Sequence, residues 1–520
     1  MVPNSPVSDI YYDPLTASPP RNNSARILHE TPPIPCLLTQ QSHPLELRLM
    51  GRDKIEEKFD PVWELLLNRY QVAASSESQG TQLKALIELT RYSDHAPEHI
   101  LARAIPTLAG LLLSNNGSTD SVKEAAVYCL KRIAFRGEGF LAREIGNSGA
   151  IPCLLRLLPL SNDGFQRVLI KCVWCLVNSA DENRVTVARN GGLEIILGML
   201  NSCVEDSGNE KWVYLLEIFS ALVLLKEVRK RLSELNGIRF LIESAKCGRM
   251  KSRERACQAI GLLGRSRRAR CMLVDLGAIP VVIELFRNGN GKTKVTAGNS
   301  LGIISSHINF IRKAAEAGAI PLYAELIQGP DPIGKEIAED ALCILAIAEE
   351  NAVAIADQLV RILREGDDES KVAASYVFCN LGTYEPSASI VRNSGAISIL
   401  VDLLRHGNLD VKGSASGVIC QLSYDRANRE ALLEAGAVPI LIGLLGDHSE
   451  DVNLRDNVAE ALVNFSQDME QGDLVAEVVN GPSFENVHTR VGRLRSSDEQ
   501  TVSSLRHLSV EQLSYNPELV

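Results

Sequence analysis

The sequence predicts an all-α protein, a solenoid in which units of three helices stack on one another. A short phrase of glycine, alanine, isoleucine and proline returns along the chain with a period of about 42 residues, which lies in the range of helical solenoids. Apolar residues recur within each copy at three- and four-residue spacing, which indicates helices and not strands. The composition, 45% hydrophobic with only 5% aromatic residues, suits a stack of helices.

The stretch from Phe140 to Ala180 shows one unit in full. Gly149 can adopt the positive φ that ends a short first helix. Pro152 is tolerated in the first turn of a second helix, where no amide donor is needed. A longer third helix follows over Phe165–Ala180. Because three short helices cannot bury all their apolar faces alone, each unit must stack on its neighbours.

The phrase recurs about ten times, which defines the repeat array over residues 53–480. Its copies are Ala104-Ile105-Pro106, Gly191-Gly192-Leu193, Gly237-Ile238, Gly277-Ala278-Ile279-Pro280, Gly318-Ala319-Ile320-Pro321, Gly395-Ala396-Ile397 and Gly436-Ala437-Val438-Pro439, with a partial opening copy at Pro61–Leu67 and a degenerate one at Ala356–Leu363. Predicted third helices span Gln79–Tyr92, Ser121–Phe135, Phe165–Ala180, Lys211–Leu225, Lys251–Gly264, Lys292–Ser305, Lys335–Ala348, Ser370–Thr383, Val411–Tyr424 and Val452–Ser466.

The two ends of the chain differ from the array. Residues 1–52 hold nine of the 22 prolines and show no sustained period, so we expect a disordered tail. Residues 481–520 are rich in serine, and disorder and a short capping helix over Val502–Leu513 are both open there. No apolar run approaches the ~20 residues that span a bilayer, and the start lacks a signal peptide. We therefore expect a soluble protein of the cytoplasm, with the nucleus as a second compartment.

We find no catalytic constellation, metal site or cofactor motif, and therefore predict a protein that is not an enzyme and carries no cofactor. Gly289-Asn290-Gly291-Lys292-Thr293 ends like a phosphate-binding loop, but it lacks the first glycine and the preceding strand. Cys172 and Cys175 match C-x-x-C inside a predicted helix, so we interpret them as core residues. The nine histidines form no zinc spacing.

The glycine, proline and leucine placement resembles the armadillo-repeat family over roughly residues 55–480. The resemblance implies a right-handed α-solenoid of about ten three-helix repeats, whose third helices line a concave groove that holds protein segments. The chain is also similar to the armadillo region of plant U-box ubiquitin ligases, although only the proline-rich tail precedes the repeats here. Ligase activity of its own is therefore not expected.

The resemblance also nominates groove residues. Nuclear-import adaptors of the family clamp a basic peptide with W-x-x-x-N on successive third helices, and Trp174 with Asn178 match that motif once. Alignment of the other helices on this pair gives a candidate groove of Tyr128, Arg132, Trp174, Asn178, Leu224, Leu262, Ile303, Ile344, Tyr376, Asn380, Gln421 and Asn464. The tandem ladder is absent, so an import receptor is not expected. The asparagines could instead hold neighbouring repeats in register, and Leu224, Leu262, Ile303 and Ile344 form either an apolar floor or part of the core.

Charge is distributed unevenly along the array. Residues 226–270 carry 14 basic and four acidic residues, a net charge near +10 in a chain of net charge −10, whereas residues 325–477 carry 27 acidic and ten basic residues. We call the following residues the basic belt: Arg229, Lys230, Arg231, Lys246, Arg249, Lys251, Arg253, Arg265, Arg267, Arg268 and Arg270, with Arg255 beside them. A charge run is usually a solvated face, but this density favours an acidic partner.

Three functions remain open at this point. The first is a monomeric scaffold or adaptor that binds a protein segment in its groove, acidic where it meets the basic belt. The second is a substrate-recognition or regulatory subunit of a ubiquitin ligase assembly. The third is binding of nucleic acid or anionic lipid through the basic belt, with no obligate nucleic acid in the first two cases.

Overall fold

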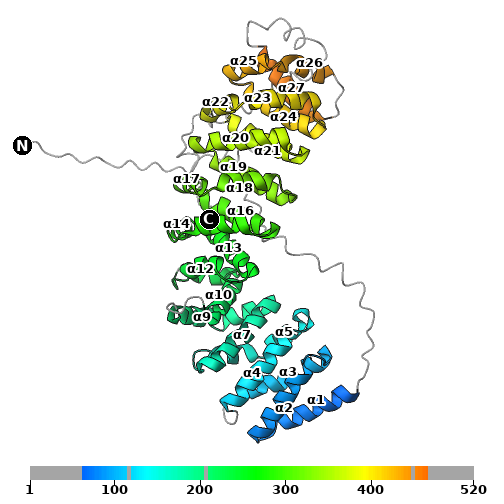
Figure 1. The fold of residues 1–520 in the computed structure, drawn as a ribbon, viewed down its shortest axis with the longest axis vertical. Helices are drawn as coiled ribbons and strands as arrows, with labels where there is room; N and C mark the ends of the chain where they lie inside the picture. The colour runs from blue at the N-terminus through cyan, green and yellow to red at the C-terminus, as the bar shows by residue number, and fades with distance from the viewer. Residues whose placement is uncertain are drawn as a thin grey trace, which may run out of the picture.

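The computed structural model describes residues 61–113, 119–203, 209–232, 234–383, 385–446 and 451–466. These residues form 27 α-helices and one short 3-10 helix, and no β-strand occurs among them. The helices build one elongated stack that runs from α1 at one end to α25, α26 and α27 at the other (Figure 1). The all-α solenoid is therefore confirmed. Residues 1–52 and 481–520, for which tails are predicted, lie outside the described residues, as do the margins 53–60 and 467–480 of the array.

The third helices form a ladder along the stack. Their bounds are α2 (Gln79–Tyr92), α4 (Asp120–Ala134), α7 (Asp163–Ser179), α10 (Glu210–Leu222), α13 (Met250–Gly264), α16 (Gly291–Ser305), α19 (Pro332–Leu345), α21 (Asp368–Thr383), α24 (Leu409–Leu422) and α27 (Val452–Phe465). Each of them packs on the next one along the chain. All ten correspond to a predicted third helix, and their ends agree with the prediction to within one turn.

The first and second helices cover the other side of this ladder. Separate pairs occur in seven repeats: α5 (Phe140–Asn147) with α6 (Ala150–Leu157), α8 (Asp181–Arg189) with α9 (Gly192–Ser202), α11 (Lys226–Leu232) with α12 (Ile238–Lys246), α14 (Arg267–Asp275) with α15 (Ala278–Asn288), α17 (Ile308–Glu316) with α18 (Ala319–Ile327), α22 (Glu385–Asn393) with α23 (Ala396–His406), and α25 (Arg426–Glu434) with α26 (Ala437–Gly446). The 3-10 helix η1 (Gly137–Gly139) precedes α5, and α1 (Pro61–Ala74) opens the stack before α2.

Two repeats depart from the predicted three-helix pattern. Their first and second helices are fused into single helices, α3 (Glu98–Leu113) and α20 (Glu349–Glu365). The break expected at Ala104-Ile105-Pro106 is therefore absent, and Pro106 lies inside α3. Separate helices elsewhere are divided by a residue of positive φ, such as Gly149 at 79°. The fused repeats have Arg103 and Ala354 at that position, and both residue types favour continuation of the helix.

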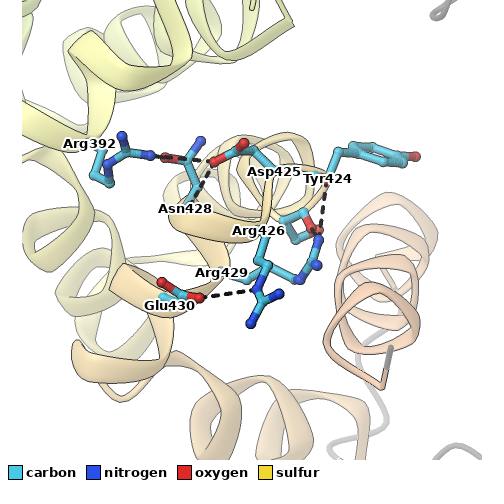
Figure 2. A network of polar contacts seen from close by, with 8 residues as sticks. Arg392, Tyr424, Asp425, Arg426, Asn428, Arg429 and Glu430 are labelled. Carbon is cyan, nitrogen blue, oxygen red and sulfur yellow. Dashed lines mark hydrogen bonds and ion pairs between the residues drawn. The ribbon is translucent and has the colours of Figure 1, made fainter. Parts of the chain in front are cut away.

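Arginine side chains close the C-terminal ends of several third helices. Arg429 on α25 donates to the carbonyl oxygens of Ser423 and Tyr424 at 2.8 and 3.2 Å (Figure 2). Arg184, Arg229 and Arg270 make the same kind of bond at the ends of α7, α10 and α13. A guanidinium here satisfies carbonyl groups that have no partner within the helix, and its charge opposes the negative end of the helix dipole.

Side chains of α25 also bind the preceding repeat. Arg392, at the end of α22, donates to Asn428 at 3.0 Å and lies 3.4 Å from the carboxylate of Asp425 (Figure 2). Asp425 in turn accepts from the backbone amide of Asn428, which caps the start of α25. One polar network therefore joins the first helix of one repeat to the start of the first helix of the next.

The two cysteines of the C-x-x-C match lie in the interior, as predicted. Cys172 and Cys175 are buried free thiols on α7, and burial raises the pKa of Cys175 to about 12. Among the described residues no group of three or more potential ligands could hold a metal ion. No single described helix is long and apolar enough to cross a membrane. The bent pair Ser387–Asn393 and Ala396–His406 passes that test of length and composition when its two helices are taken together.

Two glycine-to-alanine substitutions, one at a helix break and one inside a helix, should change stability in opposite directions. A Cβ at Gly149 would meet no atom within 4 Å, so the cost of Gly149→Ala is conformational, because φ is +79°. We expect a loss of about 1 kcal/mol in the free energy of unfolding. Gly198→Ala, inside α9 with equally open surroundings, should gain up to about 1 kcal/mol. Urea denaturation measures both, and a loss at Gly198 as large as that at Gly149 would refute the explanation.

Candidate functional site

The candidate site is the surface made by those side chains of the third helices that stay at least partly exposed, here called the third-helix face. Between α2 and α4 this face is hollowed. The hollow, of about 420 Å³, is lined by Leu86, Ile87, Thr90, Arg91, Ser121, Glu124, Ala125, Tyr128 and Val168. Ile87 is 51% exposed and Tyr128 is 38% exposed, although both are large and apolar or aromatic. An accessible apolar hollow of this kind is typical of a binding surface.

Trp174 and Asn178, the predicted clamp on α7, are bound by the protein's own residues. The guanidinium of Arg249 lies over the Trp174 ring, 4.5 Å from its centroid. Arg255 Nη1 donates to Asn178 Oδ1 at 2.5 Å. Both arginines belong to the repeat of α13, two repeats along from α7. Two arginines therefore reach across α10 and contact the two side chains that match the W-x-x-x-N motif.

Glu217 on α10 completes this contact, which we call the α7–α13 clasp. Trp174 Nε1 donates to Glu217 Oε2 at 2.5 Å, and the backbone amide of Arg249 donates to Glu217 Oε1 at 3.2 Å. The Glu217 side chain is buried, and every residue from Leu215 to Val223 of the same stretch is buried as well. This stretch of α10 therefore contributes no exposed side chain to the third-helix face.

Three cations converge beside the clasp, at the C-terminal end of α7. Arg184 Nε donates to the carbonyl oxygen of Val177 at 2.8 Å, and Arg255 binds the adjacent Asn178. Lys251 lies one turn before Arg255 on α13. Burial, followed by the charge of Arg184, lowers the pKa of Arg255 to about 10. Burial also lowers the pKa of Lys251, as do the charges of Arg255 and Arg184.

The basic belt is divided by its contacts into separate groups. Arg229 and Arg270 cap third helices, and Arg249 belongs to the clasp. Arg231, Lys246 and Arg253 form ion pairs with Glu194, Glu243 and Glu284 at 2.5, 2.9 and 2.7 Å. Lys230, Lys251, Arg265, Arg267 and Arg268 have no hydrogen bond or ion pair with another described residue. A local net charge near +10 therefore overstates the free charge that a partner meets, because half of the belt is already engaged within the fold.

The remaining candidate groove residues fall into three classes. Tyr376 is 46% exposed on α21, and Asn380 donates to its carbonyl oxygen at 3.0 Å. Leu224, Leu262, Ile303, Ile344 and Gln421 are half-buried, as is Arg132, which pairs with Asp94. Asn464 does not reach the surface: it is 3% exposed and donates to Ser423 Oγ on α24 at 2.8 Å. That residue holds two third helices together, as the alternative interpretation of the asparagines allowed.

The arginine caps bind the third helices at different distances from their ends. Arg184, Arg270 and Arg429 bind the carbonyl groups of Val177, Gly264 and Ser423. Val177 lies two residues before the end of α7, Gly264 is the last residue of α13, and Ser423 follows the last residue of α24. Arg184 binds a carbonyl group inside α7 because only one extended residue, Ala180, separates α7 from α8.

Carboxylates cluster on α19. Glu339 and Asp340 form no ion pair among the described residues, and Glu336 lies one turn before them. Burial, together with the charges of Asp340 and Glu336, raises the pKa of Glu339 to about 7. Burial and Glu336 raise the pKa of Asp340 to about 6. This part of the third-helix face therefore has a protonation state that changes close to neutral pH.

Comparisons with known proteins agree with the fold. A family model described as the armadillo/beta-catenin-like repeat matches residues 425–467. A second, the TPR-like domain of the E3 ubiquitin-protein ligase UBR4, matches residues 185–263. No curated protein sequence gives a significant match.

Among solved structures, one from a study of a phosphorylation switch in the interaction between cadherin and beta-catenin is similar, with 16% identity and a TM-score of 0.61 over 84% of this chain and 89% of that chain. An engineered protein is similar with 20% identity and a TM-score of 0.58, covering 77% of this chain and 99% of its own. A designed armadillo repeat protein in complex with the peptide (KR)4 matches 44% of this chain and 99% of its own, with 20% identity and a TM-score of 0.37.

The clasp gives the second prediction. Glu217→Ala leaves the N–H of the buried Trp174 ring and the backbone N–H of Arg249 without their acceptor, so we expect a loss of more than about 2 kcal/mol in the free energy of unfolding. Glu243→Ala is the matched control, because it removes an exposed ion pair of the same region and should change stability by less than about 0.5 kcal/mol. Similar losses in the two variants would show that Glu217 is not a structural centre.

The carboxylates of α19 give the third prediction. The pKa of Glu339 is about 7 in the folded protein against 4.5 for the unperturbed group. The folded state therefore binds more protons than the unfolded state between these values, and stability falls as the pH rises through this window. Glu339→Gln should unfold at a higher temperature than wild type above pH 7, and the gain should shrink in acid. Glu316→Gln, an exposed substitution on α17, should show no such trend. A difference in unfolding temperature between Glu339→Gln and wild type that does not change with pH would contradict the raised pKa of Glu339.

Proposed function

We propose that this chain, an armadillo-repeat protein, is a non-enzymatic scaffold or adaptor that holds a segment of a partner protein against its third-helix face. The observation that carries the proposal is the hollow between α2 and α4, where Ile87 and Tyr128 stay exposed while the neighbouring Leu86 and Cys129 are buried. A solvated repeat surface would not need large apolar side chains at these two positions.

The proposed segment has two chemical parts. Its apolar side chains would enter the hollow and set the residence time, because buried apolar anchors dominate the energy of interfaces. Its acidic side chains would meet the cations that form no ion pair with another described residue, beginning with Lys251 next to the clasp. One structurally similar protein comes from a study of the interaction between cadherin and beta-catenin, and binding of a protein segment by this chain fits that precedent.

The experiment selects ligands first and then tests where they bind. Peptides are selected from a random library on the full chain, and their dissociation constants are measured for wild type and for the double variant Ile87→Asp with Tyr128→Asp. Burying the added carboxylates against an apolar peptide is unfavourable, so we expect a loss of at least about tenfold. Leu276→Asp, at the exposed turn between α14 and α15, is the control and should bind normally. Equal affinity of all three proteins would refute the proposal.

A ubiquitin ligase subunit is the second candidate, because the match to the TPR-like domain of UBR4 covers α8 to α13. Affinity purification of the full chain followed by mass spectrometry tests it. Recovery of ligase subunits or conjugating enzymes that the Ile87→Asp and Tyr128→Asp variant loses would favour this candidate. Binding of any DNA duplex with steep salt dependence would instead favour the third candidate, an anion-binding surface.

Charge on the edge of the face gives the fourth prediction. Arg267 and Arg268 on α14 are exposed and without a partner among the described residues. Arg267→Ser with Arg268→Ser should slow the association of an acidic selected peptide and flatten its salt dependence, while dissociation stays almost unchanged. The matched control, Arg361→Ser with Arg364→Ser on α20, removes the same charge elsewhere. Identical association rates for both double variants at two salt concentrations would mean that this edge is only solvated.

A further inference from the structure

The junction of α7 and α13 holds more positive charge than the fold neutralises. Three pairs there are balanced: Arg184 with Asp181 at 2.7 Å, Lys292 with Glu254 at 3.1 Å, and Arg249 with the buried Glu217 of the clasp. Lys251 and Arg255 remain, and neither forms an ion pair with a described carboxylate. The local net charge is therefore close to +2.

The two arginines of this junction, Arg255 and Arg184, are held in place before any ligand arrives. Arg255 is 7% exposed and is fixed by Asn178, yet it uses only one of its five N–H donors in a hydrogen bond to a described residue. Arg184 is fixed one residue away by the carbonyl oxygen of Val177, and its side chain is 11% exposed. Lys251 is exposed and stands one turn from Arg255, in the first turn of α13, where the positive end of the helix dipole adds to the field.

A group of like charges is unfavourable until an anion joins it. Burial is the main cause of the lowered pKa values of Lys251 and Arg255, and the charges of the neighbouring arginines also lower them. A single carboxylate would neutralise half of the excess. A phosphate monoester carries about −1.5 to −2 charges at neutral pH and has three acceptor oxygens, so it matches the charge and can accept from the donors of Arg255 and Lys251 that bind no described residue.

We propose that Lys251, Arg255 and Arg184 form a subsite for a phosphorylated serine or threonine side chain of the bound segment. The inference rests on the proposed function for its occupant. It adds a specific requirement: the segment carries its phosphate close to the Trp174–Asn178 end of α7, and phosphorylation strengthens its binding to this face.

The first test uses the full wild-type chain without any partner. Lys251 is labelled with an amine-reactive acetylating reagent, and its rate of modification is followed by mass spectrometry. N-acetylphosphoserine amide at millimolar concentration should slow the labelling of Lys251 several-fold, because the phosphate raises the pKa of the amine and covers it. Inorganic phosphate should act more weakly, and N-acetylglutamate amide at equal ionic strength should have little effect. Lys246, which is already paired with Glu243, is the internal control.

The second test uses peptides that carry phosphoserine, serine or glutamate at one fixed position in an otherwise random library. Phosphoserine peptides should bind wild type about tenfold more tightly than serine peptides. Lys251→Ser should abolish most of that preference, and Lys246→Ser should retain it. Lys251 is exposed, so its variant should fold, whereas Arg255→Lys tests the buried member by keeping the charge and losing the planar donors.

The two proposals fail separately. If neither phosphoserine amide nor inorganic phosphate protects Lys251, or if glutamate protects it equally, the phosphate subsite is overturned. The scaffold proposal would still hold in that case if the double variant Ile87→Asp with Tyr128→Asp binds the selected peptides more weakly than wild type. Conversely, if Lys251 is protected but no peptide is selected on the full chain, the anion site is supported and the scaffold proposal is refuted.

Discussion

The structure depends on one constraint: no repeat can bury the apolar surface of its own helices. Each third helix gains its burial from the third helices on either side, and α10 is the extreme case, since its residues from Leu215 to Val223 are all buried. A repeat is therefore stable only within the array, and energies of neighbouring interfaces add along it. The same constraint leaves one continuous face of the ladder available, because only the side turned away from the stack need not be buried.

Burial of α10 also explains why the face is not uniform. The α7–α13 clasp joins residues two repeats apart, with Arg249 over Trp174 and Arg255 on Asn178. It closes the face at its basic part, while the face stays open and apolar at the α2–α4 hollow and acidic at α19. A segment that lies along this surface meets an apolar anchor, a rigid cluster of cations and a group of carboxylates in sequence. Specificity then follows from the order and spacing of these regions.

Much of the fold could be predicted from the sequence, because the helix breaks and apolar spacing are local signals. All ten third helices follow from them, whereas the fusion in α3 and α20 is a consequence of one missing glycine. Less of the candidate site could be predicted from the sequence. Ile87 could have been found as an apolar residue outside the buried stripe of α2, but no spacing rule connects Arg255 to Asn178 or Arg184 to Val177. Those contacts depend on how far each repeat turns relative to the next and on the connections between helices, such as the single extended residue Ala180, which brings Arg184 to a carbonyl group inside α7.

The most direct measurement is amide hydrogen exchange of the full chain with and without a bound peptide from the selection. We predict that protection on binding concentrates in α2, α4, α7 and the first half of α13, the helices that carry the hollow and the cation cluster. The first and second helices of the same repeats should exchange as they do in the free protein. Protection confined to α5, α8, α11 or α14, with the third helices unchanged, would contradict the claim that the third-helix face is the binding surface.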